Sequence, residues 1–228
     1  YVKNSDLNIS ALTLNMNKNN SVGIYLDSGS SMNTAGTNTI NVTGIKNTLF
    51  YVNTDGTFNQ NFLINGSSSA SYTLMYLNNN TGTYNGSAAV SGSSTLFYGK
   101  NSFIELGSNA SLVSAGGNTT GIYVDGLYSG ITDYEGINNG KMQFGDNSAG
   151  LYGVNGARLL NTGDIEVGNE SAGMSSESAD YLRNEGTIKT GSNSTGISVK
   201  NTALTENTGN ISAAGENITA LYAENSGS

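Results

Sequence analysis

The chain has 228 residues, of which 118 are Gly, Asn, Ser or Thr, and it contains no Pro, Cys, His or Trp. Without Cys and His, it can form no disulfide scaffold, zinc ribbon, thiol nucleophile or Ser-His-Asp triad. A net charge of −8 with only 9 basic residues argues against nucleic acid or an anionic membrane as a partner. No run is apolar enough to span a bilayer, so we expect no direct membrane insertion of this chain.

One short pattern recurs along the whole chain: a small residue or Leu, then a large apolar residue, then usually Tyr. The nine apolar residues lie 22 to 29 positions apart and are Ile24, Phe50, Met75, Phe97, Ile122, Leu151, Met174, Ile197 and Leu221. A second pattern, Gly followed two positions later by an apolar residue, repeats at a constant step of 23 positions at Gly140/Met142, Gly163/Ile165, Gly186/Ile188 and Gly209/Ile211. Periods in the twenties are typical of a leucine-rich horseshoe or a parallel β-helix.

Local patterning favours the β-helix. Helix formers are scarce, and short runs such as Ile122-Tyr123-Val124 alternate as strands with one buried face do. Asn and Gly, which tolerate left-handed backbone, separate these runs as corners. The absence of Pro suits strands that all donate hydrogen bonds to neighbouring turns. The sequence therefore predicts an all-β fold: residues 1–228 form one parallel β-helix segment of about nine turns, which we expect to be excised from a longer chain.

The charges of the C-terminal part test this stacking. From Glu135 onward, like charges never recur at the step of the second pattern, whereas five opposite pairs do: Glu135/Arg158, Lys141/Asp164, Glu166/Lys189, Glu177/Lys200 and Arg183/Glu206. Sheets avoid stacking like charges directly, so this distribution favours a register in which that step is one full turn. Exposed pairs stabilise by at most about 1 kcal/mol each, so they specify the register more than they stabilise the fold.

Strand alternation places the nine apolar residues in the core and the neighbouring Tyr column outside. That column is Tyr25, Tyr51, Tyr76, Tyr98, Tyr123, Tyr152 and Tyr222. By the same parity three leucines face outward, which predicts an exposed patch of Leu49, Tyr51, Leu74, Tyr76, Leu96 and Tyr98 as one candidate for partner binding. The alternative is a stacking ladder that only stiffens the rod. A Thr column two residues before the core column is expected to point inward or to a corner.

An insertion interrupts the repeat. In three later turns the next Gly follows the core apolar residue by 12 positions, whereas Gly140 follows Ile122 by 18. Six extra residues therefore protrude within 125–140. Insertions in solenoids collect on a binding face, although a tolerated surface loop is an alternative. We expect Tyr128 and Tyr134 to anchor a partner, beside Leu127, with Asp133 and Glu135 favouring a basic partner surface.

The carboxylates offer little for catalysis. Glycoside hydrolysis needs two carboxyl groups about 5 to 9.5 Å apart, one of them with a raised pKa. The nearest candidates are Asp164 with Glu166, and Asp133 with Glu135. Asp164 and Glu166 each have a Lys one repeat step away, which would keep both carboxylates ionised. We expect no catalytic residue, no metal site and no cofactor, and hence no enzyme.

The turns resemble those of a known family. Asn193–Ile197, Asn147–Tyr152 and Asn118–Tyr123, with the Asn-x-Gly-x-Ile runs at Asn161, Asn184 and Asn207, are similar to passenger turns of bacterial type V autotransporters, above all the very large fusobacterial outer-membrane adhesins. The resemblance implies a right-handed β-helix exported to the cell surface at the outer membrane. It also implies a stalk or ligand-binding region that contacts a host receptor, some of them immunoglobulin-like, or a galactose-type glycan. The alternative is a carbohydrate-active β-helix, such as a polysaccharide lyase or a phage tailspike. An ice-binding solenoid is a more distant one, because it would need paired Thr-x-Thr ranks.

Overall fold

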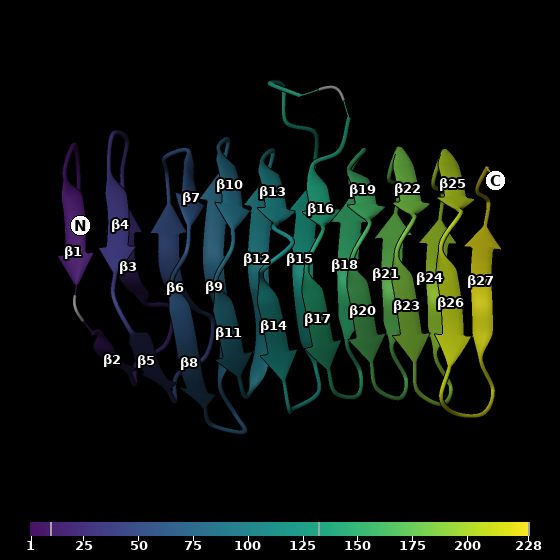
Figure 1. The fold of residues 1–228 in the computed structure, drawn as a ribbon, viewed down its shortest axis with the longest axis horizontal. Helices are drawn as coiled ribbons and strands as arrows, with labels where there is room; N and C mark the ends of the chain where they lie inside the picture. The colour runs from purple at the N-terminus through teal and green to yellow at the C-terminus, as the bar shows by residue number, and fades with distance from the viewer. Residues whose placement is uncertain (10, 132, 228) are drawn as a thin grey trace.

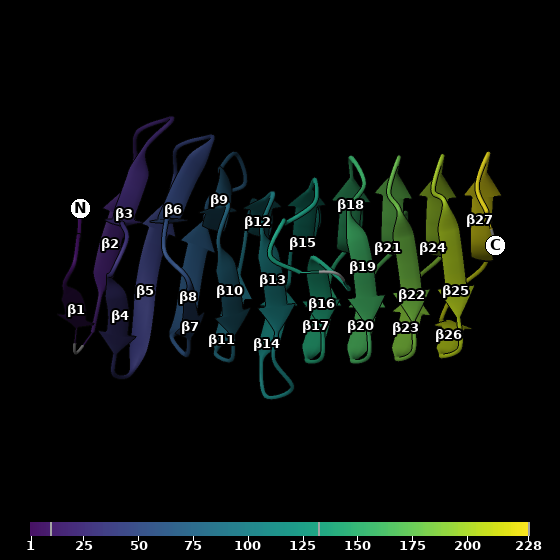
Figure 2. The ribbon, with the colours of Figure 1, turned by 90° about the horizontal axis from the view of Figure 1, so that it is seen from above.

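The computed structural model describes residues 1–9, 11–131 and 133–227. These residues form 27 β-strands and no helix. Three strands make one turn, and the turns lie side by side from the N-terminus to the C-terminus (Figures 1 and 2). Each sheet joins every third strand, and all pairing is parallel. The predicted all-β parallel β-helix of about nine turns is confirmed.

The first of the long sheets is called the tyrosine sheet after the side chains on its outer face. Its nine strands are β3 (Val22–Leu26), β6 (Asn47–Val52), β9 (Ser71–Asn78), β12 (Ser93–Lys100), β15 (Thr119–Asp125), β18 (Ala149–Val154), β21 (Ala172–Glu177), β24 (Thr195–Lys200) and β27 (Thr219–Glu224).

Two more long sheets and one short sheet complete the turns. The second nine-stranded sheet contains β2 (Thr13–Met16), β5 (Thr37–Val42), β8 (Asn61–Gly66), β11 (Ser87–Val90), β14 (Ser111–Ser114), β17 (Lys141–Phe144), β20 (Asp164–Val167), β23 (Thr187–Thr190) and β26 (Asn210–Ala213). The seven-stranded sheet contains β7 (Gly56–Phe58), β10 (Thr81–Tyr84), β13 (Phe103–Leu106), β16 (Gly136–Asn138), β19 (Arg158–Asn161), β22 (Tyr181–Asn184) and β25 (Leu204–Asn207). At the N-terminal end, β1 (Asp6–Ile9) pairs with β4 (Ser31–Thr34).

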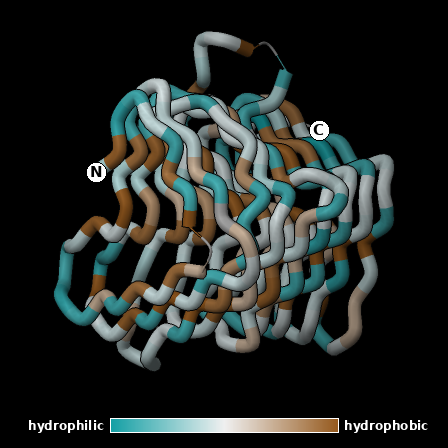
Figure 3. Tube along the Cα trace, turned by 60° about the vertical axis from the view of Figure 1, so that its left-hand side comes forward, coloured by the Kyte–Doolittle hydropathy of each residue, from teal (hydrophilic) through white to brown (hydrophobic). Residues whose placement is uncertain are grey.

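The predicted core column exists in the predicted register. Strand pairing places its nine residues one above another, from Ile24 opposite Phe50 to Ile197 opposite Leu221. Between Phe50 and Ile197 these side chains are at most 2% exposed, whereas Leu221 in the last turn is 40% exposed. Apolar residues from the other sheets, among them Ile188 and Leu182, join the same core. Figure 3 looks obliquely along the rod, where hydrophobic and hydrophilic residues alternate along the turns.

The charge pairs also fall into the predicted register. Strand pairing makes direct neighbours of Lys141/Asp164, Glu166/Lys189, Glu177/Lys200 and Arg183/Glu206. The fifth pair, Glu135 and Arg158, forms an ion pair. Both partners of the Lys189–Glu166 ion pair are substantially exposed, with 2.9 Å between Nζ and Oε1.

The corners use asparagine in left-handed backbone, as predicted. Of the 14 described non-glycine residues with positive φ, 11 are Asn. One corner column precedes the tyrosine sheet and includes Asn118, Asn147, Asn193 and Asn217, with φ between 54° and 61°. Asn adopts this conformation more readily than most residues because its short polar side chain can bond locally. The repeated Asn therefore sets where each turn bends.

Strict alternation fails at one position of the tyrosine sheet, and the predicted outward orientation of Leu49, Leu74 and Leu96 is wrong. All three are 0% exposed. In each strand pair of this sheet the residue at this position has no paired residue in the neighbouring strand. Thr73 and Met75, for example, have paired residues in both neighbouring strands, whereas Leu74 between them has none. The strand bends here, and two successive side chains, Leu74 and Met75, both enter the core.

Other turns have glycine at this bend, because the core there leaves no room for a side chain. A Cβ on Gly150 would lie 2.5 Å from the carbonyl oxygen of Gly173 and 2.6 Å from Cγ2 of Ile165. Because of the bend, the side chains that precede it point to the opposite face from the one that strict alternation predicts. The Thr column, predicted to point inward or to a corner, is half-buried or exposed at Thr48, Thr73, Thr95, Thr120, Thr195 and Thr219.

A buried asparagine ladder runs beneath the corner that follows the seven-stranded sheet. Nδ2 of Asn138 donates to Oδ1 of Asn161, Asn161 donates to Asn184 and Asn184 donates to Asn207, each over 2.7 Å. Asn138, Asn161 and Asn184 are 0% exposed. Buried amides are costly unless they are hydrogen-bonded, so each of these residues depends on its counterpart in the next turn.

We predict that Ile197→Asp destabilises the fold by about 4 kcal/mol or more, because it buries an unpaired charge in the core column. The matched control is Ser198→Asp on the outer face of the same strand, which should change stability by less than about 1 kcal/mol. Urea denaturation followed by circular dichroism measures both. Equal tolerance of the two substitutions would contradict the orientation of this strand.

We predict that Asn161→Ala costs about 2 to 4 kcal/mol, because it leaves a donor of Asn138 and an acceptor of Asn184 buried without their partner. The control is Asn41→Ala in an exposed ladder, where Asn41 donates to Asn15 over 2.7 Å and accepts from Asn65 over 2.9 Å. Water replaces those bonds, so the control should cost less than about 1 kcal/mol. Similar losses of urea midpoint in both variants would refute a special role for the buried ladder.

Candidate binding surface

The outer face of the tyrosine sheet carries a continuous aromatic ladder. Ring centroids of successive residues from Tyr25 to Tyr152 lie 4.7 to 5.1 Å apart, close to the spacing of paired strands. Stacked aromatic pairs stabilise by about 0.5 to 1.5 kcal/mol beyond the area that they bury. The predicted Tyr column is thus a stiffening ladder, and between its ends it presents ring edges and hydroxyl groups rather than ring faces.

Four ladder tyrosines, Tyr76, Tyr98, Tyr123 and Tyr152, have a raised hydroxyl pKa. Burial raises the pKa of Tyr98, and the neighbouring Asp125, which accepts a hydrogen bond from Tyr98 Oη over 3.1 Å, raises it further. Burial also raises the pKa of Tyr76, Tyr123 and Tyr152. These four hydroxyl groups are therefore neutral hydrogen-bonding groups at physiological pH.

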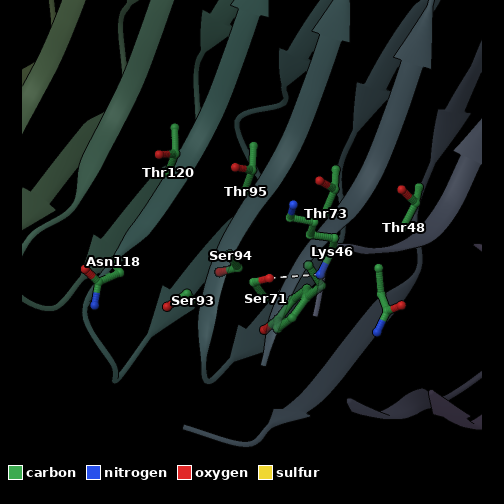
Figure 4. Close-up of a pocket in the computed structure, with 11 residues that line it drawn as sticks. Lys46, Thr48, Ser71, Thr73, Ser93, Ser94, Thr95, Asn118 and Thr120 are labelled. Atoms are coloured by element: carbon green, nitrogen blue, oxygen red, sulfur yellow. Dashed lines mark hydrogen bonds between the residues drawn. The ribbon is translucent and has the colours of Figure 1, made fainter. Parts of the chain in front are cut away.

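A hydroxyl-lined groove follows one flank of the ladder over β6, β9, β12 and β15 (Figure 4). Its sides are two rows of outward residues, Thr48, Thr73, Thr95 and Thr120, and Lys46, Ser71, Ser93 and Asn118. The backbone N–H of Lys46 donates to Ser71 Oγ over 2.9 Å. The second row was not anticipated from the sequence, although it stands two residues before each Thr, on the same face of the strands.

The insertion forms a loop between β15 and β16, as predicted, and the structure describes its residues 126–131 and 133–135. It projects beyond the neighbouring corners of the rod (Figure 1). Leu127 is 46% exposed, Asp133 is exposed and Tyr128 is half-buried. These three candidate partner-binding residues are therefore accessible.

The other two candidates have structural contacts. Glu135 is 0% exposed, so the prediction that it faces a partner is wrong. Its carboxylate forms an ion pair with Arg158 and accepts the backbone N–H of Arg158 over 2.9 Å. Arg158 Nη2 also donates to the carbonyl oxygen of Ile131 over 3.3 Å. Glu135 raises the pKa of Arg158. The pair fastens the base of the loop to β19.

Tyr134 lies against the rod rather than projecting from it. Its ring stacks on Tyr181 of β22, with centroids 5.5 Å apart and an interplanar angle of 25°. It is half-buried. Leu127 is therefore the exposed large apolar residue among the described residues of the loop, with half-buried Tyr128 beside it. Tyr134 and Glu135 hold the loop in place.

The carboxylates form no metal cluster in the part of the chain that the structure describes. Asp164 and Glu166 project from β20, where their direct neighbours in the flanking strands are Lys141 and Thr187 for the first, and Gln143 and Lys189 for the second. No helix among the described residues is long and apolar enough to cross a bilayer.

Comparisons with models of protein families, with characterised proteins and with solved structures find no match to this chain.

We predict that Arg158→Ala destabilises the protein by about 3 to 5 kcal/mol, because it leaves the buried carboxylate of Glu135 without its counter-ion. Lys189→Ala removes one partner of the exposed pair with Glu166 and should cost at most about 1 kcal/mol. Thermal and urea unfolding compare the two variants. If both were equally mild, the ion pair at Arg158 would not anchor the loop.

Proposed function

We propose that this chain is a non-enzymatic segment of a cell-surface adhesin, in which the β-helix displays binding groups to a host receptor or a glycan. The observation that carries the proposal is the loop 126–135. It interrupts an otherwise regular stack, exposes Leu127 beside Tyr128, and is fastened by the Glu135–Arg158 pair. Specific recognition depends on a few aromatic or apolar anchors, and a loop that is fastened at its base has less entropy to lose on binding than a free one.

The setting of the chain supports the same proposal. The turns resemble autotransporter passengers, which act outside the cell at the outer membrane. The polar, acidic, Cys-free composition suits a rod that remains in contact with water along its length. Exposed Asp133 favours a partner with a basic surface at the loop. The same rod would serve as a spacer between other binding regions of a longer adhesin.

The proposal is tested by measuring binding of the purified chain to cultured host cells, a receptor-ectodomain array and a glycan array. The double variant Leu127→Ala/Tyr128→Ala should weaken binding to the partner so identified by about tenfold or more. Its β-rich circular dichroism and melting temperature should stay unchanged, because neither residue belongs to the core. Leu204→Ala is the control, since Leu204 on β25 is 40% exposed, close to the 46% of Leu127.

Three outcomes would contradict the proposal or its binding site. Absence of binding to cells and to both arrays would remove the adhesive function and leave only a spacer. New reducing ends or unsaturated products from a polysaccharide panel would instead identify a carbohydrate-active β-helix. Equal affinity of the double variant and the unmodified chain would move the binding site from the loop to the tyrosine sheet.

A further inference from the structure

The tyrosine ladder is interrupted in two successive turns. Ser175 on β21 and Ser198 on β24 stand in register with Tyr152, and Tyr222 resumes the column on β27. A hollow of about 590 Å³ lies on the outer face there, over β18, β21 and β24. The hollow is a shallow, open depression rather than an enclosed cavity, with room for about one sugar ring. We call it the Tyr152 hollow.

Tyr152 has an aromatic neighbour on one side only. On one side its ring packs against Tyr123, with centroids 5.1 Å apart and an interplanar angle of 45°. On the other side its neighbour in the paired strand is Ser175, which is too small to cover an aromatic ring. Tyr152 lines the hollow. The internal ladder residues Tyr51, Tyr76, Tyr98 and Tyr123, by contrast, have a ring on each side.

The turn that contains Ser175 also carries an unusual corner residue. Glu170 lines the hollow and has a φ of 55°, at the corner that Asn147 and Asn193 occupy in the turns before and after it. Glu adopts this left-handed conformation less readily than Asn or Gly. The turn that removes the aromatic ring thus also places an exposed carboxylate at the rim of the hollow.

We propose that the Tyr152 hollow binds one pyranose ring of a glycan, which would be a specific site for the adhesive function proposed above and rests on it. The apolar C–H face of a pyranose matches the uncovered face of Tyr152. The carboxylate of Glu170 accepts hydrogen bonds from sugar hydroxyl groups, and charge-assisted bonds of this kind are the stronger ones. Ser175, Ser198 and Asn193, which also line the hollow, supply further donors and acceptors.

The lining favours a sugar over other ligands. The remaining residues are mainly Asn, Ser, Thr and Ala, so a purely apolar side chain would find few apolar partners. A phosphate group or nucleic acid would face Glu170 and a chain with net charge −8, which repel it. A neutral polyol with one apolar face matches both the open ring and the polar rim.

The test is saturation-transfer NMR with the methyl glycosides of glucose, galactose, mannose and N-acetylglucosamine. The chain should transfer saturation to ring C–H protons of at least one of them. Tyr152→Ser should weaken binding of that glycoside by about tenfold. This variant repeats the Ser of the next two turns, so the fold accommodates it. The matched control, Tyr76→Ser, removes a ladder residue far from the hollow and should leave the affinity unchanged.

Glu170→Asn separates binding from stability. It restores the residue of the neighbouring corners, so the melting temperature should rise or stay the same, while the sugar affinity falls. Absence of saturation transfer from all four glycosides, or equal binding by Tyr152→Ser and Tyr76→Ser, would overturn the inference. Adhesion to cells that persists after either result would leave the adhesin proposal standing. Sugar binding without any adhesion to cells would support the sugar site and contradict the adhesin proposal.

Discussion

Parallel pairing between successive turns is the constraint on which the rest of this structure depends. It places each residue about 4.8 Å from its counterpart in the next turn. A repeated residue type therefore stabilises the fold only if its side chains interact favourably with each other at that distance. Amides meet this condition by forming ladders such as Asn138–Asn161–Asn184, and tyrosines meet it by stacking. Like charges do not, and the chain keeps charged residues to 11% and alternates their sign between stacked positions.

The same constraint shapes the core at the bend of the tyrosine sheet. Two successive inward positions would overfill a narrow interior if both were always large. In the later turns Gly150, Gly173 and Gly196 leave room at the first position, and Ile165, Ile188 and Ile211 from the second nine-stranded sheet reach toward them. In turns two to four, Leu49, Leu74 and Leu96 fill the space instead. The strand bends at the same position in these turns, while different residues fill the core space beside it.

The sequence predicts what is periodic and fails where periodicity ends. The core column and the five charge pairs followed from spacing alone, because the register is the repeat. The outward placement of Leu74 failed because it assumed strict alternation along the strand. The strand bends between Leu74 and Met75, so both side chains enter the core. Glu135 was assigned to a partner because it lies in an insertion, although its spacing from Arg158 matches the repeat and also predicted the ion pair that holds it.

Side chains that belong to the repeat contact their counterparts in the neighbouring turns, so groups available to a ligand are expected where the repeat is interrupted. The loop 126–135 leaves Leu127 exposed, and Ser175 leaves one face of Tyr152 open. The loop joins β15 to β16, whereas the hollow lies over β18, β21 and β24 of the tyrosine sheet. The stacked strands fix the separation of these two places. Two weak contacts held at a fixed separation gain effective concentration when one partner spans both, which a flexible chain with the same two sites would provide less well.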